Sequence, residues 1–264
     1  MSRKPKLGVF KFASCDGCQL SMLDAEEHLL GIAGQVDIAY FLEARSHIDA
    51  GPYDVALVEG SVTTAHDAER IQEIRRKSKT LITIGACATA GGIQALRNWH
   101  DVDDFIRYVY AHPDYIQTLK TSTPIADHVQ VDFELRGCPI SVEQLVELIT
   151  SVVLGRKPRF PNESVCMECK RQGTVCVVVA QGTPCLGPVT HSGCGSICPA
   201  HNRGCYGCFG PKENAQPLGL LRDYQSHGCD QRQLVDLVRN FNGYSPEFRE
   251  AVEQFETSIS SDNA

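Results

Sequence analysis

Thirteen cysteines are the residues of this 264-residue chain with the most distinctive chemistry. They fall into an early set of four, a dense set of eight and one late residue: Cys15, Cys18, Cys87 and Cys138; Cys166, Cys169, Cys176, Cys185, Cys194, Cys198, Cys205 and Cys208; and Cys229. Thiolates bind zinc and iron–sulfur clusters, whereas disulfides need an oxidising compartment. The N-terminal sequence lacks the apolar stretch of a secretory signal, and the pair Arg75-Arg76 lies too far into the chain for a twin-arginine leader. We therefore expect a cytoplasmic chain whose cysteines bind metal.

The early cysteines follow segments that we expect to be strands. Cys15 and Cys18 come after residues 6–12, Cys87 after 80–85, and Cys138 after 129–135. The carboxyl ends of parallel strands meet at one edge of a sheet, so these four thiols are expected to converge there. Four thiolates suit either a tetrahedral zinc ion or an iron–sulfur cluster. Each cysteine taken singly could instead be a small buried hydrophobe, but that interpretation does not explain why all four follow strands in glycine-rich turns.

The eight dense cysteines have a spacing that predicts two four-cysteine sites. The order is Cys166-x2-Cys169-x6-Cys176-x8-Cys185-x8-Cys194-x3-Cys198-x6-Cys205-x2-Cys208. A pair of zinc ribbons is the competing interpretation, because zinc ribbons also use C-x2-C pairs. Only the outermost pairs have that form here, and the inner cysteines lie in Gly-Pro turns, which favours iron–sulfur clusters. Zinc remains the alternative.

Helices must alternate with the expected strands to position the early cysteines. Residues 36–40 and 54–59 are typical of buried parallel strands, and helical patterns cover about 20–30 and 65–77. Ser141 and Gln144 form a capping-box pattern at the start of a further helix, and Gly155 predicts its end. The alternation predicts an α/β fold with a doubly wound parallel sheet, whose ligands lie beyond the carboxyl ends of the strands.

The C-terminal part of the chain has a different composition. Residues 156–161 are typical of a linker, and residues 162–212 have too few large hydrophobes for an ordinary core, so metal or bridges must hold them together. The tail from Pro217 has helical patterning. We therefore expect a domain over residues 1–158, a small Cys-rich iron–sulfur module over 159–215 and a helical extension over 216–264.

Composition and missing motifs exclude several classes of protein. The formal net charge of −7 argues against a nucleic-acid binder, and no apolar run approaches the length of a membrane span. The first strand is not followed by G-x-G-x-x-G, and the chain has no G-x4-G-K-[ST]. A nucleotide or nicotinamide site in this chain is therefore not expected.

Together these motifs resemble the small subunit of [NiFe] hydrogenases. The matching stretches, spread over residues 6 to about 212, are Cys15-x2-Cys18, Glu59-Gly60-Ser61, Gly85-x-Cys87-x4-Gly92, Arg136-Gly137-Cys138-Pro139, Cys185-Leu186-Gly187-Pro188-Val189-Thr190, Cys194 and Gly204-Cys205-Tyr206-Gly207-Cys208. The chain is most similar to the delta-type small subunit of the cytoplasmic, multisubunit branch, that of NAD(P)-linked sulfhydrogenases.

The resemblance implies a flavodoxin-like domain and three [4Fe-4S] clusters. The implied ligands are Cys15, Cys18, Cys87 and Cys138 for a proximal cluster; Cys194, Cys198, Cys205 and Cys208 for a medial cluster; and Cys166, Cys169, Cys176 and Cys185 for a distal cluster. Ferredoxin-type modules can exchange a cysteine between clusters, so Cys185 and Cys198 could be assigned the other way.

The resemblance also implies that this chain relays electrons and holds no catalytic residue of its own. Dihydrogen would react at a nickel–iron site in a large subunit, and flavin- and iron–sulfur-containing subunits would reduce NAD(P). Three alternatives stay open: a zinc-stabilised scaffold, a hydrogen sensor, and the cluster-bearing subunit of NADH:quinone oxidoreductase, which has adjacent cysteines at its first turn and lacks the eight-cysteine extension. Glu59 could serve a subunit interface, a proton relay or a helix cap, and Cys229 is expected to be a free thiol.

Overall fold

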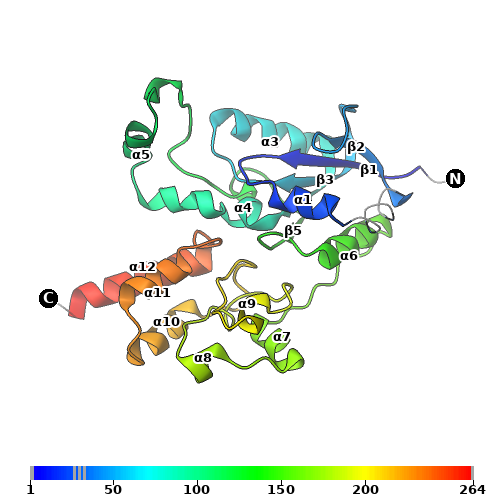
Figure 1. The fold of residues 1–264 in the computed structure, drawn as a ribbon. Helices are drawn as coiled ribbons and strands as arrows, with labels where there is room; N and C mark the ends of the chain where they lie inside the picture. Colours follow the sequence, from blue (N-terminus) through cyan, green and yellow to red (C-terminus); the bar gives the residue numbers. More distant parts are fainter. Residues whose placement is uncertain (1–2, 26–27, 29–30, 32–33, 263–264) are drawn as a thin grey trace. The chain divides into compact units, whose positions relative to one another are not determined.

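The computed structural model describes residues 3–25, 28, 31 and 34–262, and the chain forms two compact units, Met1–Phe160 and Pro161–Ala264. The first unit contains a five-stranded, all-parallel sheet with the strand order β2-β1-β3-β4-β5 (Figure 1). Its strands are β1 (Lys6–Lys11), β2 (Asp37–Phe41), β3 (Tyr53–Glu59), β4 (Ser78–Ile84) and β5 (Phe133–Leu135). This is the flavodoxin-like order, so the predicted fold class is confirmed.

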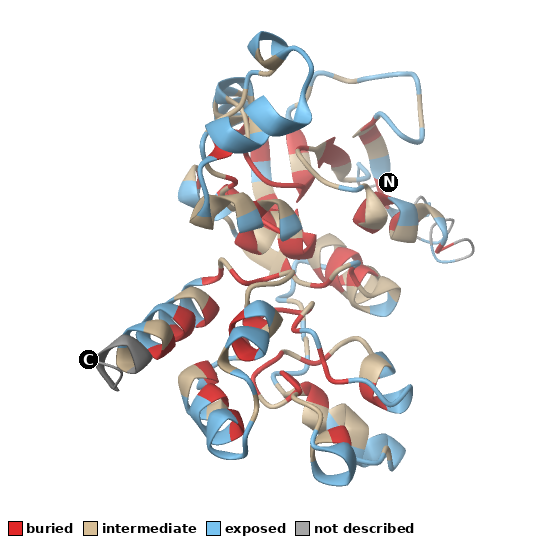
Figure 2. Ribbon diagram, turned by 60° about the vertical axis from the view of Figure 1, so that its left-hand side comes forward, coloured by how far each residue is buried: buried red, intermediate tan, exposed pale blue. Residues whose placement is uncertain are grey.

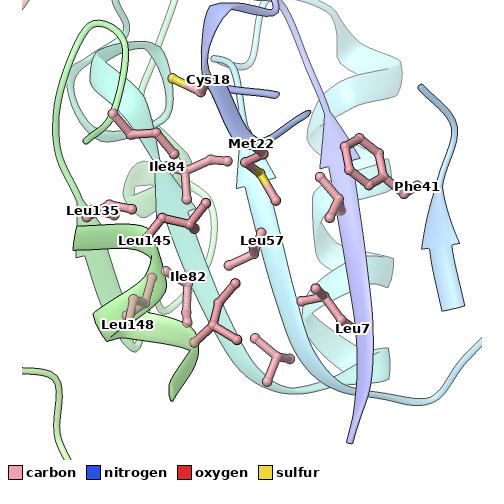
Figure 3. Packing of buried hydrophobic residues seen from close by; sticks show 14 of the residues in the cluster. Leu7, Cys18, Met22, Phe41, Leu57, Ile82, Ile84, Leu135, Leu145 and Leu148 are labelled. Carbon is pink, nitrogen blue, oxygen red and sulfur yellow. The ribbon is translucent and has the colours of Figure 1, made fainter. Parts of the chain in front are cut away.

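Both faces of the sheet are buried because the strands are nearly continuous apolar runs, and successive side chains point to opposite faces. On one face, Leu57 of β3 and Ile82 of β4 pack with residues of α1 (Gly17–Leu23) and α6 (Val142–Val153), as Figure 3 shows. On the other face, Ala56 and Val58 pack with residues of α3 (Ala65–Lys77) and α4 (Gly85–Ala90). Helices on both faces hold the sheet, and therefore its carboxyl edge, in a fixed geometry.

The capping and periodicity patterns of the sequence correctly predicted α3 and α6. α3 has the predicted bounds, and Thr64 Oγ1 accepts a hydrogen bond from the Asp67 N–H at its start. The predicted cap of α6 is confirmed, because Ser141 Oγ accepts a hydrogen bond of 3.3 Å from the Gln144 N–H. Gly155 has the left-handed conformation expected just beyond the end of that helix.

Two predicted elements differ from the structure. The strand predicted over 129–135 is reduced to β5, because the Asp132 carboxylate already accepts the Leu81 N–H at 2.8 Å and the N–H of Val129 bonds Ile125 locally. The helix predicted over about 20–30 begins earlier, at Gly17, and α1 ends at Leu23, although His28 is again helical. Residues 26–27 and 29–30, which the prediction also included, lie outside the described part of the chain.

Shorter elements complete the first unit, and the second unit is helical (Figure 1). The shorter elements of the first unit are α5 (Val102–Val109) and the 3-10 helices η1 (Ile93–Trp99), η2 (Pro113–Tyr115) and η3 (Ile125–Asp127). The helices of the second unit are α7 (Val165–Gln172), α8 (Val177–Gln181), α9 (Ile197–Ala200), α10 (Pro217–Ser226), α11 (Gln231–Val238) and α12 (Pro246–Asp262). Among the described residues, no helix combines the length and the apolar character that crossing a bilayer needs.

The tail helices supply the core that the cysteine-rich segment lacks. Leu186 and Val189 are buried in one hydrophobic core with residues of α10, α11 and α12, including Leu221 and Phe255. Figure 2 shows buried positions recurring between exposed ones along these helices. The cysteine-rich segment therefore packs with the tail inside the second unit. The predicted boundaries of the three parts stay a prediction.

Candidate metal centres

The sheet-edge group, which we define as Cys15, Cys18, Cys87 and Cys138, lies just past the carboxyl ends of three strands. Cys15 and Cys18 follow β1, Cys87 lies in α4 after β4, and Cys138 follows β5. These cysteines influence each other electrostatically: burial, and then Cys87 and Cys15, raise the pKa of the Cys138 thiol to about 11. Burial likewise raises the pKa of Cys18, with smaller effects from Glu59, Cys87 and Cys138. The fold therefore brings cysteines from three distant stretches of sequence into electrostatic range.

Glycines border the sulfurs of this group where no larger residue would fit. A Cβ on Gly85 would lie 2.4 Å from Cys18 Sγ, and a Cβ on Gly92 would lie 2.6 Å from Cys87 Sγ. Both glycines also have positive φ, at 82° and 68°, which other residues rarely adopt. The bare backbone thus leaves room beside the thiols.

Glu59, the last residue of β3, is buried beside this group. Its carboxylate accepts hydrogen bonds from the Cys18 N–H at 3.0 Å and from Gln19 Nε2 at 2.7 Å. Burial raises the pKa of Glu59, although both hydrogen bonds oppose that rise. The side chain of Asp16, at the N-cap of α1, makes no capping hydrogen bond, so Glu59 at the end of β3 caps this helix instead. Of the roles considered for Glu59, helix capping is the one that these contacts provide.

The second unit contains a 166–185 group: Cys166 and Cys169 on α7, Cys176 before α8, and Cys185 in the turn that follows. Burial, and then Cys185, Cys169 and Cys176, raise the pKa of the Cys166 thiol to about 11. A Cβ on Gly187 would lie 3.3 Å from Cys185 Sγ and 3.4 Å from Cys166 Sγ, so this glycine lies against both sulfurs. These four thiols thus lie within electrostatic range of one another.

A 194–208 group, Cys194, Cys198, Cys205 and Cys208, adjoins the previous one. Burial is the main cause of the raised pKa of Cys194, and Glu168 and then Cys198 contribute. The pKa of Cys205 is raised by burial first, then by Cys185 and Cys208. The Cys205 N–H donates a hydrogen bond of 3.1 Å to Cys185 Sγ, so Cys185 borders both groups. The division of Cys185 and Cys198 between two sites therefore stays a prediction.

The donor set in all three groups suits thiolate-bound iron–sulfur clusters. Four cysteines contribute to each group, glycines lie beside sulfurs of the sheet-edge group and the 166–185 group, and backbone N–H groups point at Cys185 and Cys205. None of the thirteen cysteines forms a disulfide, and Cys229 is a partly buried member of the tail core. Over the described residues, no three His, Cys, Asp or Glu side chains are arranged to hold a single metal ion.

Comparisons with known proteins define the family. Residues 15–152 match the family described as NADH ubiquinone oxidoreductase, 20 Kd subunit. Sulfhydrogenase 2 subunit delta of Pyrococcus furiosus is 37% identical over 216 residues, covering 82% of this chain and 90% of that protein. The chain belongs to the 20-kDa subunit family. A vhu-type F420-non-reducing hydrogenase subunit of Methanocaldococcus jannaschii, another relative, is 32% identical over 244 residues, covering 81% of this chain and 84% of that protein.

A solved structure agrees with this assignment. The match is a chain of an NAD+-reducing [NiFe]-hydrogenase in the H2-reduced state, with a TM-score of 0.56 and 31% identity, and it covers 60% of this chain and 96% of that chain. The predicted resemblance to the delta-type small subunit of a hydrogenase is confirmed by these relatives.

Three residues of this 20-kDa subunit family member contact the cysteine loops and were missed by sequence reasoning. The Tyr224 hydroxyl in α10 accepts the Cys185 N–H at 3.2 Å and donates to the Cys185 carbonyl at 2.7 Å. Buried Asn242 donates from Nδ2 to the carbonyls of Gly207 and Cys208, both at 2.9 Å. Glu168, between Cys166 and Cys169, bonds the loop of Cys194. No motif marks the first two, and only its place within Cys166-x2-Cys169 could have marked Glu168.

Proposed function

We propose that this chain is the electron-transfer subunit of a [NiFe] hydrogenase, relaying electrons between the nickel–iron site of a large subunit and a flavin-bearing NAD(P)-reducing partner. The observation that carries the proposal is the convergence of the sheet-edge group from three strand ends in a chain 37% identical to a sulfhydrogenase delta subunit. The resemblance of the sequence motifs to hydrogenase small subunits supports the same role.

The proposal assigns three [4Fe-4S] clusters to the three cysteine groups. The sheet-edge group would hold the proximal cluster, the 194–208 group the medial cluster and the 166–185 group the distal cluster. When bound, each cluster would supply a site that accepts and releases one electron. The protein excludes water by burying Cys18, Cys185 and Cys205, and donates backbone N–H bonds to the Cys185 and Cys205 sulfurs. Burial and hydrogen bonds to sulfur are the means by which a protein sets cluster potentials.

The first test is the metal content of anaerobically purified protein. Three four-iron clusters predict about twelve irons and as many acid-labile sulfides per chain, and brown material. A colourless protein with about two or three zinc ions would support the scaffold alternative instead.

Cysteine substitutions then test the assignment. Cys87→Ser should remove or convert the proximal cluster and abolish H2-driven NAD(P) reduction in the assembled complex, whereas Cys208→Ser should leave the proximal spectrum intact while interrupting the relay. Cys229→Ser is the matched control, because this cysteine belongs to none of the three groups, and it should keep all the iron. Wild-type turnover in the Cys87→Ser complex would contradict the proposal.

The partner of this chain can be identified by experiment. The relatives' names include NAD-reducing and F420-non-reducing hydrogenases, and the family name itself is that of a quinone oxidoreductase subunit. Affinity purification of the tagged chain from its own cells would separate these possibilities. Co-purification of a subunit with paired C-x2-C nickel ligands supports a hydrogenase, and its absence alongside a quinone-reducing or signalling partner supports the alternatives.

A further inference from the structure

Glu168 projects from α7 onto the loop of Cys194, which belongs to the 194–208 group. Its Oε1 accepts hydrogen bonds from the N–H groups of Gly193 at 2.8 Å and Gly195 at 3.3 Å, and its Oε2 accepts the Ser196 N–H at 3.1 Å. Oε2 also lies 3.8 Å from Cys194 Sγ, which donates to it. One carboxylate thus binds three backbone N–H groups and touches the thiol between them.

The loop over residues 193–196 is held to α7 by side-chain hydrogen bonds. Gly193, Gly195 and Ser196 have φ values of 137°, 66° and 51°, so the loop follows neither a helix nor a strand. Successive N–H groups in such a conformation point to one side and form a concave anion-binding site, or nest. Gln172, one helical turn beyond Glu168, adds a second attachment: its Nε2 donates to the Gly195 carbonyl at 3.1 Å, and its Oε1 accepts the Ser196 hydroxyl at 2.8 Å.

The location of Glu168 connects the two cysteine groups of the second unit. Its neighbours Cys166 and Cys169 are in the 166–185 group, whereas its hydrogen bonds end on the loop of Cys194 in the 194–208 group. A side chain fixed at both ends sets the distance between the parts it joins. A negative charge beside a ligand sulfur also disfavours reduction, because the added electron is repelled by it.

We propose that Glu168 is a positioning residue that fixes the Cys194 loop against α7, and that its negative charge lowers the reduction potential of the cluster on Cys194. This inference rests on the proposed function, because it requires a cluster on Cys194. It predicts an effect confined to one of the three clusters, although Glu168 is adjacent in sequence to ligands of another.

The test is a potentiometric titration of the full chain, monitored by electron paramagnetic resonance, with iron and sulfide measured on the same samples. Cys194→Ser identifies which redox step belongs to the cluster on Cys194. Glu168→Gln removes the charge at nearly constant shape, and we expect at least a tenfold rise in the reduced-to-oxidised ratio of that step at a fixed potential, a positive shift of about 59 mV. The other two steps should not move. Glu163→Gln is the matched control, because that nearby carboxylate pairs with Arg171 and should leave all steps unchanged.

The outcomes separate this inference from the proposed function. A wild-type chain without iron would overturn both, whereas a fully loaded Glu168→Gln chain with unshifted steps would overturn only the inference. If Glu168→Gln loses iron from the Cys194 site, Glu168→Asp, which keeps the charge, should retain it. Equal loss of iron in both variants would overturn the inference, because the charge would then have no role of its own.

Discussion

The two units hold their cysteines in opposite ways. In the first, the sheet-edge group lies in loops and first helical turns beyond the sheet, and both faces of that sheet are buried without help from any cysteine but Cys18. In the second, Cys185 and Cys205 are themselves half of a small buried core completed by Val165 and Val177. The fold of the first unit positions its cysteines, whereas in the second unit buried cysteines are themselves part of the core.

Both units nevertheless use a carboxylate in the same manner. Glu59 caps the helix of Cys18 from a neighbouring strand, and Glu168 binds the loop of Cys194 from a neighbouring helix. In each case a carboxylate satisfies backbone N–H groups that regular secondary structure leaves free. The two units therefore differ in what packs around the cysteines, not in how the cysteine turns are fixed.

The largest expected difference between the two units is in their amide protection after removal of the proposed metal. After treatment of the anaerobic protein with a chelator, amide protection should be lost over residues 164–210, because that segment has few buried apolar groups besides cysteines. Amides of β3 and β4 should keep their protection. Hydrogen exchange followed by mass spectrometry measures both segments in one sample, and equal protection in the two units after iron removal would refute the contrast.

A side chain at Gly85 should disrupt the sheet-edge group while the sheet persists. Gly85→Ala combines a positive φ with a Cβ 2.4 Å from Cys18 Sγ, so we expect a loss of about 3 kcal/mol or more in unfolding free energy and of about four irons. Gly155→Ala has a similar φ but open space around its Cβ, and it should cost only about 1–2 kcal/mol and no iron. Urea titration and iron analysis distinguish the two, and matching iron contents would contradict the assigned role of Gly85.

Loss of one hydroxyl from the tail should loosen the cysteine loops of the second unit. Tyr224→Phe leaves the buried N–H and C=O of Cys185 without their partner, which should lower the opening free energy of the Leu186 amide by about 2 kcal/mol. Native-state hydrogen exchange at that amide is the measurement. Tyr206→Phe, which removes an exposed hydroxyl beside Cys205, is the control and should change nothing. Equal behaviour of the two variants would show that the Tyr224 hydroxyl does not stabilise the Cys185 loop.

The smallest expected effect is at the helix cap of the first unit. Ser141→Ala removes the hydroxyl that accepts the Gln144 N–H and should lower the unfolding free energy of the first unit by about 1 kcal/mol, with no change in iron content. The urea midpoint of the unfolding transition and the iron assay check this. A loss of iron would mean that the geometry of the sheet-edge group depends on the cap of α6, contrary to this prediction.

Sequence patterns predicted the elements whose signals are local. α3 and α6 are marked by caps and apolar periodicity within a few residues, and β3 and β4 by short β-branched runs. The predicted length of β5 was too great. Alternation at 129–135 did not reveal that the Asp132 carboxylate accepts the hydrogen bond of the Leu81 N–H. The early start of α1 was also missed, since its capping group is 41 residues away in sequence.

The number and spacing of the cysteines, the strand–helix alternation and the resemblance to hydrogenase subunits could all be read from the sequence. Which polar groups hold the cysteine loops depends on the tertiary structure, because Tyr224 lies 39 residues from Cys185 and Glu168 lies 28 from Ser196. Periodicity and capping report on groups a few residues apart. A buried N–H must find an acceptor wherever packing brings one, and the composition of the chain does not specify that location.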